Sequence, residues 1–204
     1  RSNTTKVRIG YSSLEIGLDI PERIEKTENQ PFLLSTKNLN GNFEGATGRI
    51  DLFPVETPKI NLRPGLWETV DRQILREQEY RKHFPRDSYA GEHKPENWPI
   101  GELIASKVFD TGVSKEITME ALQSLPPGLY KVVMTAGKDS IKTERFFTLY
   151  NRYQKRAPSP VWLEAGLSQE SAQPGDTVLL NLTTSERNLW VLFQANLGKE
   201  VVME

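Results

Sequence analysis

The sequence predicts a mostly β chain: an antiparallel β-sandwich that a helical, proline-rich insertion interrupts and that part of a second sandwich follows. Two observations support this fold class. Short segments alternate apolar and polar residues with a period of two, which places one face of a strand on a core. Between these segments, residues 54–101 are rich in proline, which the interior of a regular sheet excludes. We therefore expect strands on both sides of this insertion.

The first predicted strands precede the insertion. In residues 14–20 every even-numbered position is apolar and shares one face of a strand. Residues 32–37 and 48–53 flank the pair Asn40-Gly41, and Asn-Gly supplies the positive φ angles of a tight hairpin turn. We expect these two segments to pair with each other as a hairpin.

Strands resume after the insertion, at residues 102–110 and 115–121. The segment 129–136 shows a stronger pattern, because its even-numbered residues are all apolar. A glycine-containing turn follows, and residues 141–150 return as the partner strand. We expect this hairpin to close a first domain over residues 1–151.

One segment of the insertion has helical character. Leu66–Phe84 lacks proline and glycine, and Trp67, Val70 and Ile74 recur at helical spacing among polar residues. We expect an amphipathic helix of about four or five turns that Pro85 ends. A long insertion is a place where function can lie, but we favour a structural role, in which the helix caps one open end of the sandwich.

A second domain is predicted after a polar, proline-bearing linker at residues 152–160. Residues 161–204 contain four predicted strands, at 161–165, 176–184, 188–195 and 200–204. A complete sandwich of the immunoglobulin-like kind needs about seven strands and about 100 residues. We therefore expect this segment to be the first part of a domain in a longer, modular protein.

The last two predicted strands, at residues 188–195 and 200–204, need a covering layer or a partner strand. In residues 188–195 both faces are apolar, so this strand needs cover on two sides. Residues 200–204 are expected to be an unpaired edge strand. An exposed edge of this kind predicts that two copies dimerise through it, or that the second half is poorly ordered.

The composition excludes several classes of function. The 26 basic and 27 acidic residues give a formal net charge of −1, so the chain has no long-range field to attract nucleic acid or an anionic membrane. No apolar run reaches the roughly 18 residues that a membrane helix needs. The absence of cysteine excludes disulfides, thiolate nucleophiles and cysteine metal sites.

The candidate chemistry is weak. Glu79 lies four residues before His83 on the predicted helix, but without a third ligand at a defined spacing this pair is better interpreted as a solvated helix face. Neither a phosphate-binding glycine loop nor a nucleophile turn is present, and nothing singles out two carboxylates for hydrolysis. We therefore expect no catalytic residue, no cofactor, no metal and no enzymatic activity.

Tryptophans remain as candidates for a contact with a ligand or partner. Trp67 and Trp98 lie in the insertion, and Trp98 is the better candidate for an exposed stacking platform. An anchor that holds the loop is nonetheless the favoured role of Trp98. Trp190 is expected in the core of the second domain, and Trp162 at the junction between the domains.

Three stretches carry a resemblance to a known family: residues 34–42 with 48–53, residues 125–130, and residues 173–178. They resemble, in this order, the opening hairpin of a macroglobulin-type domain, the Leu-x-Pro-Gly-x-Tyr start of its late strand, and the start of the next module. The chain thus resembles the immunoglobulin-like, macroglobulin-type β-sandwich domains of bacterial alpha-2-macroglobulin-like proteins, particularly the large Bacteroidetes forms.

The resemblance implies a non-enzymatic structural module that helps to build a cage or arm around a protease. Its implied partners are the neighbouring domains of the same parent chain and a protease, and its implied location is the periplasm or the cell surface. Many such proteins trap proteases through a Cys-Gln thioester, which cannot lie within this cysteine-free segment. An alternative function stays open, namely a carbohydrate-binding or accessory β-sandwich of a secreted glycan-processing protein, with Trp67 or Trp98 as platform.

Overall fold

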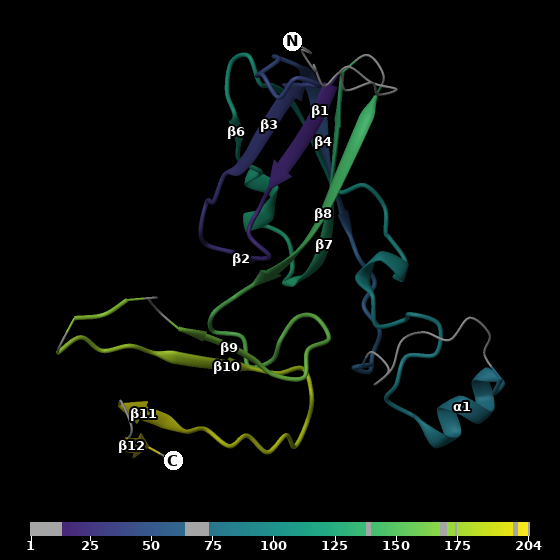
Figure 1. Cartoon of the computed structure of the whole chain (residues 1–204), viewed down its shortest axis with the longest axis vertical. Coiled ribbons are helices and arrows are strands. Elements are labelled where there is room, and N and C mark those ends of the chain that lie inside the picture. The colour runs from purple at the N-terminus through teal and green to yellow at the C-terminus, as the bar shows by residue number, and fades with distance from the viewer. Residues whose placement is uncertain are drawn as a thin grey trace, which may run out of the picture.

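A computed structural model describes residues 14–63, 74–137, 140–167, 171–173, 175–197 and 200–203. Of the described residues, 39% lie in strands and 8% in helices, which confirms that the chain belongs to the predicted mostly β class. Two of its sheets pack face to face and share one hydrophobic core (Figure 1). Two further sheets, each of two strands, lie outside this sandwich-like body.

The smaller sheet of the sandwich has the order β1-β3-β6 and is antiparallel throughout. Its strands are β1 (Leu14–Asp19), β3 (Phe32–Asn38) and β6 (Glu116–Ile117). In β3 buried and exposed residues alternate from Phe32 to Lys37, which is the burial pattern of a strand with one face on a core.

The larger sheet has the order β2-β8-β7-β4-β5. Its strands are β2 (Arg23–Glu25), β4 (Thr47–Pro54), β5 (Ala105–Asp110), β7 (Gly128–Ala136) and β8 (Ile141–Tyr150). Only β2 runs parallel to its neighbour, β8, and the other pairs are antiparallel. The predicted hairpin of residues 129–136 and 141–150 is confirmed as β7 and β8.

The predicted pairing of residues 32–37 with 48–53 is wrong. The turn itself forms, with Gly41 at a φ of 83° and an isolated bridge between Lys37 and Phe43. The chain then crosses to the other sheet, where β4 pairs with β5 and β7. The reason is tertiary: in that register Ile50 and Leu52 are completely buried beside the long strand β7.

The core lies between the two sheets. Phe147 of β8 sits at its centre, with its ring centroid 6.0 Å from Phe32 and 5.7 Å from Tyr130. A short 3-10 helix, Glu120–Gln123, adds Leu122 to the same core. The hydroxyls of Thr36 and Thr111 lie 2.7 Å apart and link the two sheets by a buried hydrogen bond.

The insertion joins β4 to β5, which are themselves paired. Its base is closed by a bridge between Val55 and Ile100 and by a hydrogen bond from Gly101 N to Pro54 O of 2.9 Å. It contains α1 (Glu77–His83) and a 3-10 helix (Pro95–Asn97).

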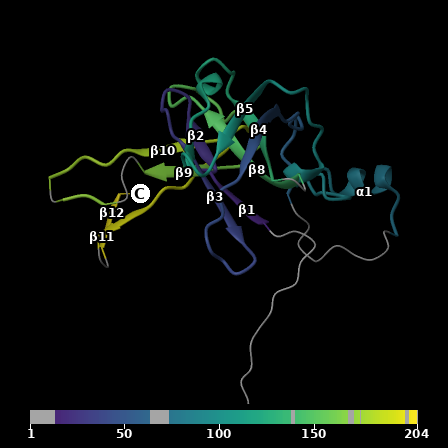
Figure 2. The same cartoon turned by 90° about the horizontal axis from the view of Figure 1, so that it is seen from above.

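The predicted helix over residues 66–84 is only partly confirmed. Residues 64–73 lie outside the described residues, and 74–76 are not helical, so the described helix begins at Glu77. It ends just before Pro85, as expected. None of its residues is buried, and it stands off from both sheets (Figures 1 and 2), so this helix does not cap the sandwich. A charged seven-residue helix has no apolar stripe with which to do so.

After β8 no regular element forms until β9 (Glu164–Leu167), which pairs with β10 (Leu180–Thr183). A separate hairpin follows, made of β11 (Ala195–Leu197) and β12 (Glu200–Met203). The domain limits at residues 151 and 161 stay a prediction. Within the described residues, no helix is long and apolar enough to cross a membrane.

Three expectations for this C-terminal part need correction. Residues 188–194 form no strand, because no sheet covers either of their apolar faces. Trp190, expected in a core, is 98% exposed for the same reason. The last strand is not an unpaired one, since β12 pairs with β11 over a short, irregular ladder.

Candidate functional site

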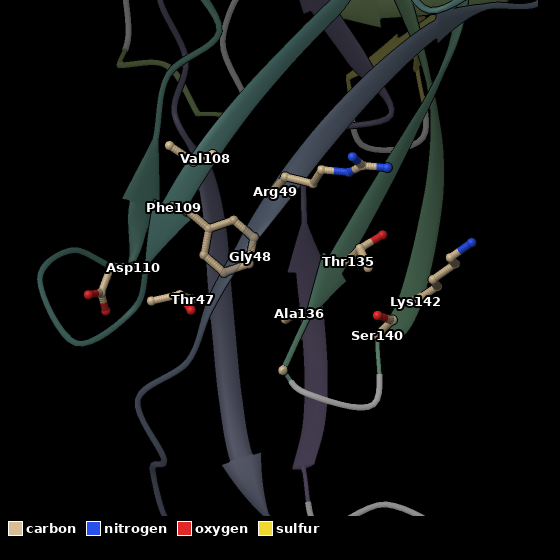
Figure 3. Close-up of a pocket in the computed structure, with 11 residues that line it drawn as sticks. Thr47, Gly48, Arg49, Val108, Phe109, Asp110, Thr135, Ala136, Ser140 and Lys142 are labelled. Carbon is tan, nitrogen blue, oxygen red and sulfur yellow. The ribbon is translucent and has the colours of Figure 1, made fainter.

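An open depression lies over the ends of β4, β5 and β7 (Figure 3). Its volume is about 910 Å³, and the charged groups on its rim are Arg49, Asp110 and Lys142. These groups do not converge: Asp110 lies on one side of the depression, while Ser140 and Lys142 lie on the other.

The described residues that line the depression do not form the arrangement that a reaction needs. Asp110 Oδ1 accepts a hydrogen bond of 2.8 Å from Gly112 N, and Arg49 Nε pairs with Asp51 at 2.9 Å. Both groups therefore stabilise the local backbone and the sheet surface. No histidine is among the lining residues, and no nucleophile is paired with a base there.

Two tryptophans, Trp67 and Trp98, are predicted as candidates for a contact with a ligand or partner. Trp67 lies outside the described residues. Trp98 is half-buried, and its indole Nε1 donates a hydrogen bond of 2.6 Å to Glu92 O. Trp98 thus links two parts of the insertion, which agrees with its favoured role as an anchor of the loop. Its contact with a ligand or partner stays a prediction.

Glu92 organises this part of the insertion. Its carboxylate accepts hydrogen bonds from Ser88 Oγ at 2.8 Å and Ala90 N at 2.7 Å, and it pairs with Arg81 of α1 at 2.7 Å. Burial alone would raise the pKa of the Glu92 carboxyl, but the hydrogen bonds and Arg81 together lower it. Arg81 in turn has a raised pKa, first because of its hydrogen bond to Glu77.

The predicted pair of Glu79 and His83 lies on α1, as expected. The described part of the chain contains no group of three or more histidine or carboxylate side chains that could hold a metal ion. His83 instead lies beside Phe84, with the ring centroids 6.4 Å apart.

A long-range polar network lies at the junction between the insertion and the C-terminal strands. Asn61 of the insertion is 3% exposed. Its side-chain nitrogen donates hydrogen bonds of 3.1 Å to Val161 O and 2.9 Å to Ser185 Oγ. The same Ser185 hydroxyl accepts a hydrogen bond of 3.0 Å from Val161 N. One buried amide therefore joins three segments that are far apart in the sequence.

Charged and aromatic groups extend this junction. Arg86 of the insertion pairs with Glu186 at 3.0 Å, and its guanidinium lies 5.5 Å from the ring centroid of Trp162. The expected position of Trp162 at a junction is therefore consistent with the structure. Arg86 is exposed, so this ion pair contributes at most about 1 kcal/mol, and the buried amide of Asn61 is the stronger contact.

The sandwich contacts the C-terminal strands directly through β2. Arg23 pairs with Glu164 of β9 at 3.0 Å, and its guanidinium lies 4.4 Å from the ring centroid of Tyr150. These contacts position the chain where it leaves β8.

Glu25, also in β2, holds the start of the predicted linker. Its buried carboxylate accepts hydrogen bonds from the backbone and hydroxyl of Thr27 and from Arg152 N. Burial by itself would raise the pKa of this carboxyl, but the hydrogen bonds from Thr27 and Arg152 outweigh burial and lower it.

Sequence reasoning missed Asn61 and Ser185, and it interpreted Arg86 only as one of several charged residues on a solvated face. The only local signal was a polar residue, Asn61, between the apolar residues Ile60 and Leu62. Nothing in the sequence links it to Ser185, which lies 124 positions away.

Comparisons with known proteins give no identification. No protein-family model matches this chain, and no curated protein and no solved structure is significantly similar to it.

Proposed function

We propose that this chain is a non-enzymatic structural module of an alpha-2-macroglobulin-like protein, in which the insertion fixes the C-terminal strands relative to the sandwich. The observation that carries this proposal is the Asn61 junction, a buried polar contact whose geometry serves orientation and not turnover. A buried, satisfied amide favours one arrangement, because any other leaves its donors unpaired.

The strand order supports the immunoglobulin-like part of the proposal. In immunoglobulin-like sandwiches the strands G, F and C are neighbours in one sheet, and variable-type domains add C′ beside C. The order β8-β7-β4-β5 corresponds to G-F-C-C′, and β1-β3-β6 corresponds to A-B-E in the opposite sheet. In this assignment the insertion replaces the short loop between C and C′.

Tyr130 gives a second, independent support. It stands near the start of β7, and its hydroxyl donates a hydrogen bond of 2.6 Å to Pro126 O, four residues upstream. Immunoglobulin-like domains place a tyrosine at the equivalent corner before strand F, with the same kind of backbone contact. Burial raises the pKa of this tyrosine, so its hydroxyl stays protonated and remains a donor.

The proposal extends, on the resemblance alone, to a contribution to protease trapping by a periplasmic or surface-attached parent. The carbohydrate-binding alternative is less well supported, because Trp98 is half-buried and its indole nitrogen already has a partner.

The test is a distance measurement between the sandwich and the C-terminal strands. The chain contains no cysteine, so spin labels at Arg145→Cys and Asn181→Cys report one distance by pulsed electron paramagnetic resonance. We expect a single narrow distribution, because both sites lie on strands that the junction connects.

Asn61→Ala should broaden that distribution, and Asn40→Ala, in an exposed turn, should leave it unchanged. A broad distribution without the Asn61 substitution would mean that the two parts move independently. In that case the chain is not a rigid arm and the proposal fails.

A further inference from the structure

A second cleft lies at the junction itself, where three segments meet. Its walls come from the insertion at residues 57–61 and 86, from residues 156–160, and from residues 185–187. Its volume is about 530 Å³, within the range of roughly 300–1,000 Å³ that small-molecule sites occupy.

The cleft is strongly cationic in a chain that is nearly neutral. Its charged lining residues are Lys59, Arg86, Arg156, Arg187 and a single carboxylate, Glu186. The whole chain has a formal net charge of −1, so this excess of positive charge is local. Cations that gather on the walls of a cleft focus the electrostatic field there and attract anions.

Most of these cations have no protein counter-ion. Glu186 is already paired with Arg86 at 3.0 Å. Lys59, Arg156 and Arg187 are exposed, and none of them forms an ion pair with any residue that the structure describes. Holding these like charges around one cleft without an anion is electrostatically unfavourable.

The remaining lining groups suit an oxyanion. Thr57 and Ser159 contribute hydroxyl groups to the cleft, whereas the Ser185 hydroxyl is occupied by its hydrogen bonds with Asn61 and Val161. Pro58, Pro158 and Pro160 contribute no backbone N–H, which reduces the number of backbone donors along the cleft and leaves a larger share of recognition to side chains.

We propose that this cleft binds a multivalent oxyanion, a small molecule with two or more carboxylate, sulfate or phosphate groups. More than one anionic group is needed because the unpaired cations come from three different segments. A bound anion of this kind would link the insertion, residues 156–160 and residues 185–187, and so strengthen the junction. This site does not depend on membership of any family, since it rests on the charges of the cleft alone.

The experiment is calorimetric titration of the whole chain with three probes: citrate, tripolyphosphate and sucrose octasulfate. At least one should bind with one-to-one stoichiometry, and the order of affinities identifies the preferred anionic group. The triple variant Lys59→Ala, Arg156→Ala, Arg187→Ala should weaken binding at least about tenfold, because each charge-assisted hydrogen bond that is lost weakens binding by about that factor or more.

The matched control is the triple variant Lys94→Ala, Lys142→Ala, Arg145→Ala. It removes the same charge from exposed positions outside the cleft, so it should retain the affinity within about twofold. Both triple variants are more negative than the unsubstituted chain by three charges. Equal weakening in both would mean that binding depends on the overall charge and not on the cleft, and it would overturn the proposal, as would the absence of binding by all three probes.

A second measurement guards against a variant that fails to fold. In the unsubstituted chain, amide chemical-shift changes on adding the best probe should centre on Ala157, Ser159 and Val161 and on residues 185–187. Changes centred instead on Gly48 and Gly137, which line the depression of Figure 3, would contradict the proposed site.

Discussion

The sandwich buries the apolar side chains of its strands, whereas the C-terminal strands leave many of theirs exposed. Leu149 of β8 is 0% exposed, whereas Leu182 of β10 is 44% exposed and Leu192 is 85% exposed. Both regions have strands with apolar residues. The difference is that β8 belongs to a five-stranded sheet packed on a second sheet, while β9-β10 and β11-β12 are two-stranded ribbons.

The comparison shows that strand pairing alone does not stabilise this chain. A two-stranded ribbon is marginal in water unless another layer covers its apolar face. The C-terminal strands are therefore positioned by polar contacts, through Asn61, Arg86 and Arg23, and not by a hydrophobic core. Each prediction below changes one region and leaves the other as its control.

The largest effect is expected from Phe147→Ala in the centre of the sandwich core. Phe147 is 1% exposed and contacts Phe32 and Tyr130, so its removal leaves a cavity that costs about 3–5 kcal/mol of unfolding free energy. Leu192→Ala, in the exposed segment, should change the same free energy by less than about 0.5 kcal/mol. Urea denaturation of the sandwich measures both, and equal costs would disprove the contrast between the regions.

A glycine pair sharpens the comparison at the level of backbone packing. A Cβ on Gly48 in β4 would collide with Thr135 O and would lie 2.7 Å from Phe109 Cζ, so Gly48→Ala should destabilise the sandwich by about 1–3 kcal/mol. A Cβ on Gly166 in β9 would have no atom within 4 Å of it apart from the neighbouring residues of the chain, so Gly166→Ala should be neutral or slightly stabilising. Thermal unfolding compares the two variants, and a destabilising Gly166→Ala would indicate cover that the structure does not show.

The junction should respond to Asn61→Ala, which removes the donors to Val161 O and Ser185 Oγ. Loss of a buried amide with its partners left in place costs about 1–3 kcal/mol. Hydrogen exchange should accelerate at the amides of Val161 and Ser185 and stay unchanged in β7. Faster exchange throughout β7 would mean that the junction and the sandwich unfold together.

The smallest effect is a pH dependence that Glu25 introduces where the chain leaves β8. In the folded state the pKa of this carboxyl is lowered from its ordinary value of 4.5, because the folded structure stabilises the ionised form. Its contribution is therefore fully present above about pH 4.5 and is lost as the pH falls through the lowered folded value. Glu25→Gln should flatten this part of the stability profile, and an unchanged slope in that variant would assign the pH dependence to other groups.

Much of the local structure could be predicted from the sequence. The alternation in β1 and β7 marked each strand and its buried face, and Pro85 marked the end of α1. These features depend on neighbouring residues, so a period of two or a proline is enough to recognise them.

The tertiary structure alone decided which strands are neighbours and which residues meet. The Asn40-Gly41 turn formed as expected, yet β4 joined the other sheet because burial of Ile50 and Leu52 beside β7 outweighs a local hairpin. Trp190 was expected in a core but is exposed, because no other layer of the described residues covers it. The apolar character of a residue does not by itself determine whether such a layer is present. Asn61 and Ser185 meet across 124 positions, and a contact of that range follows from the path of the whole chain.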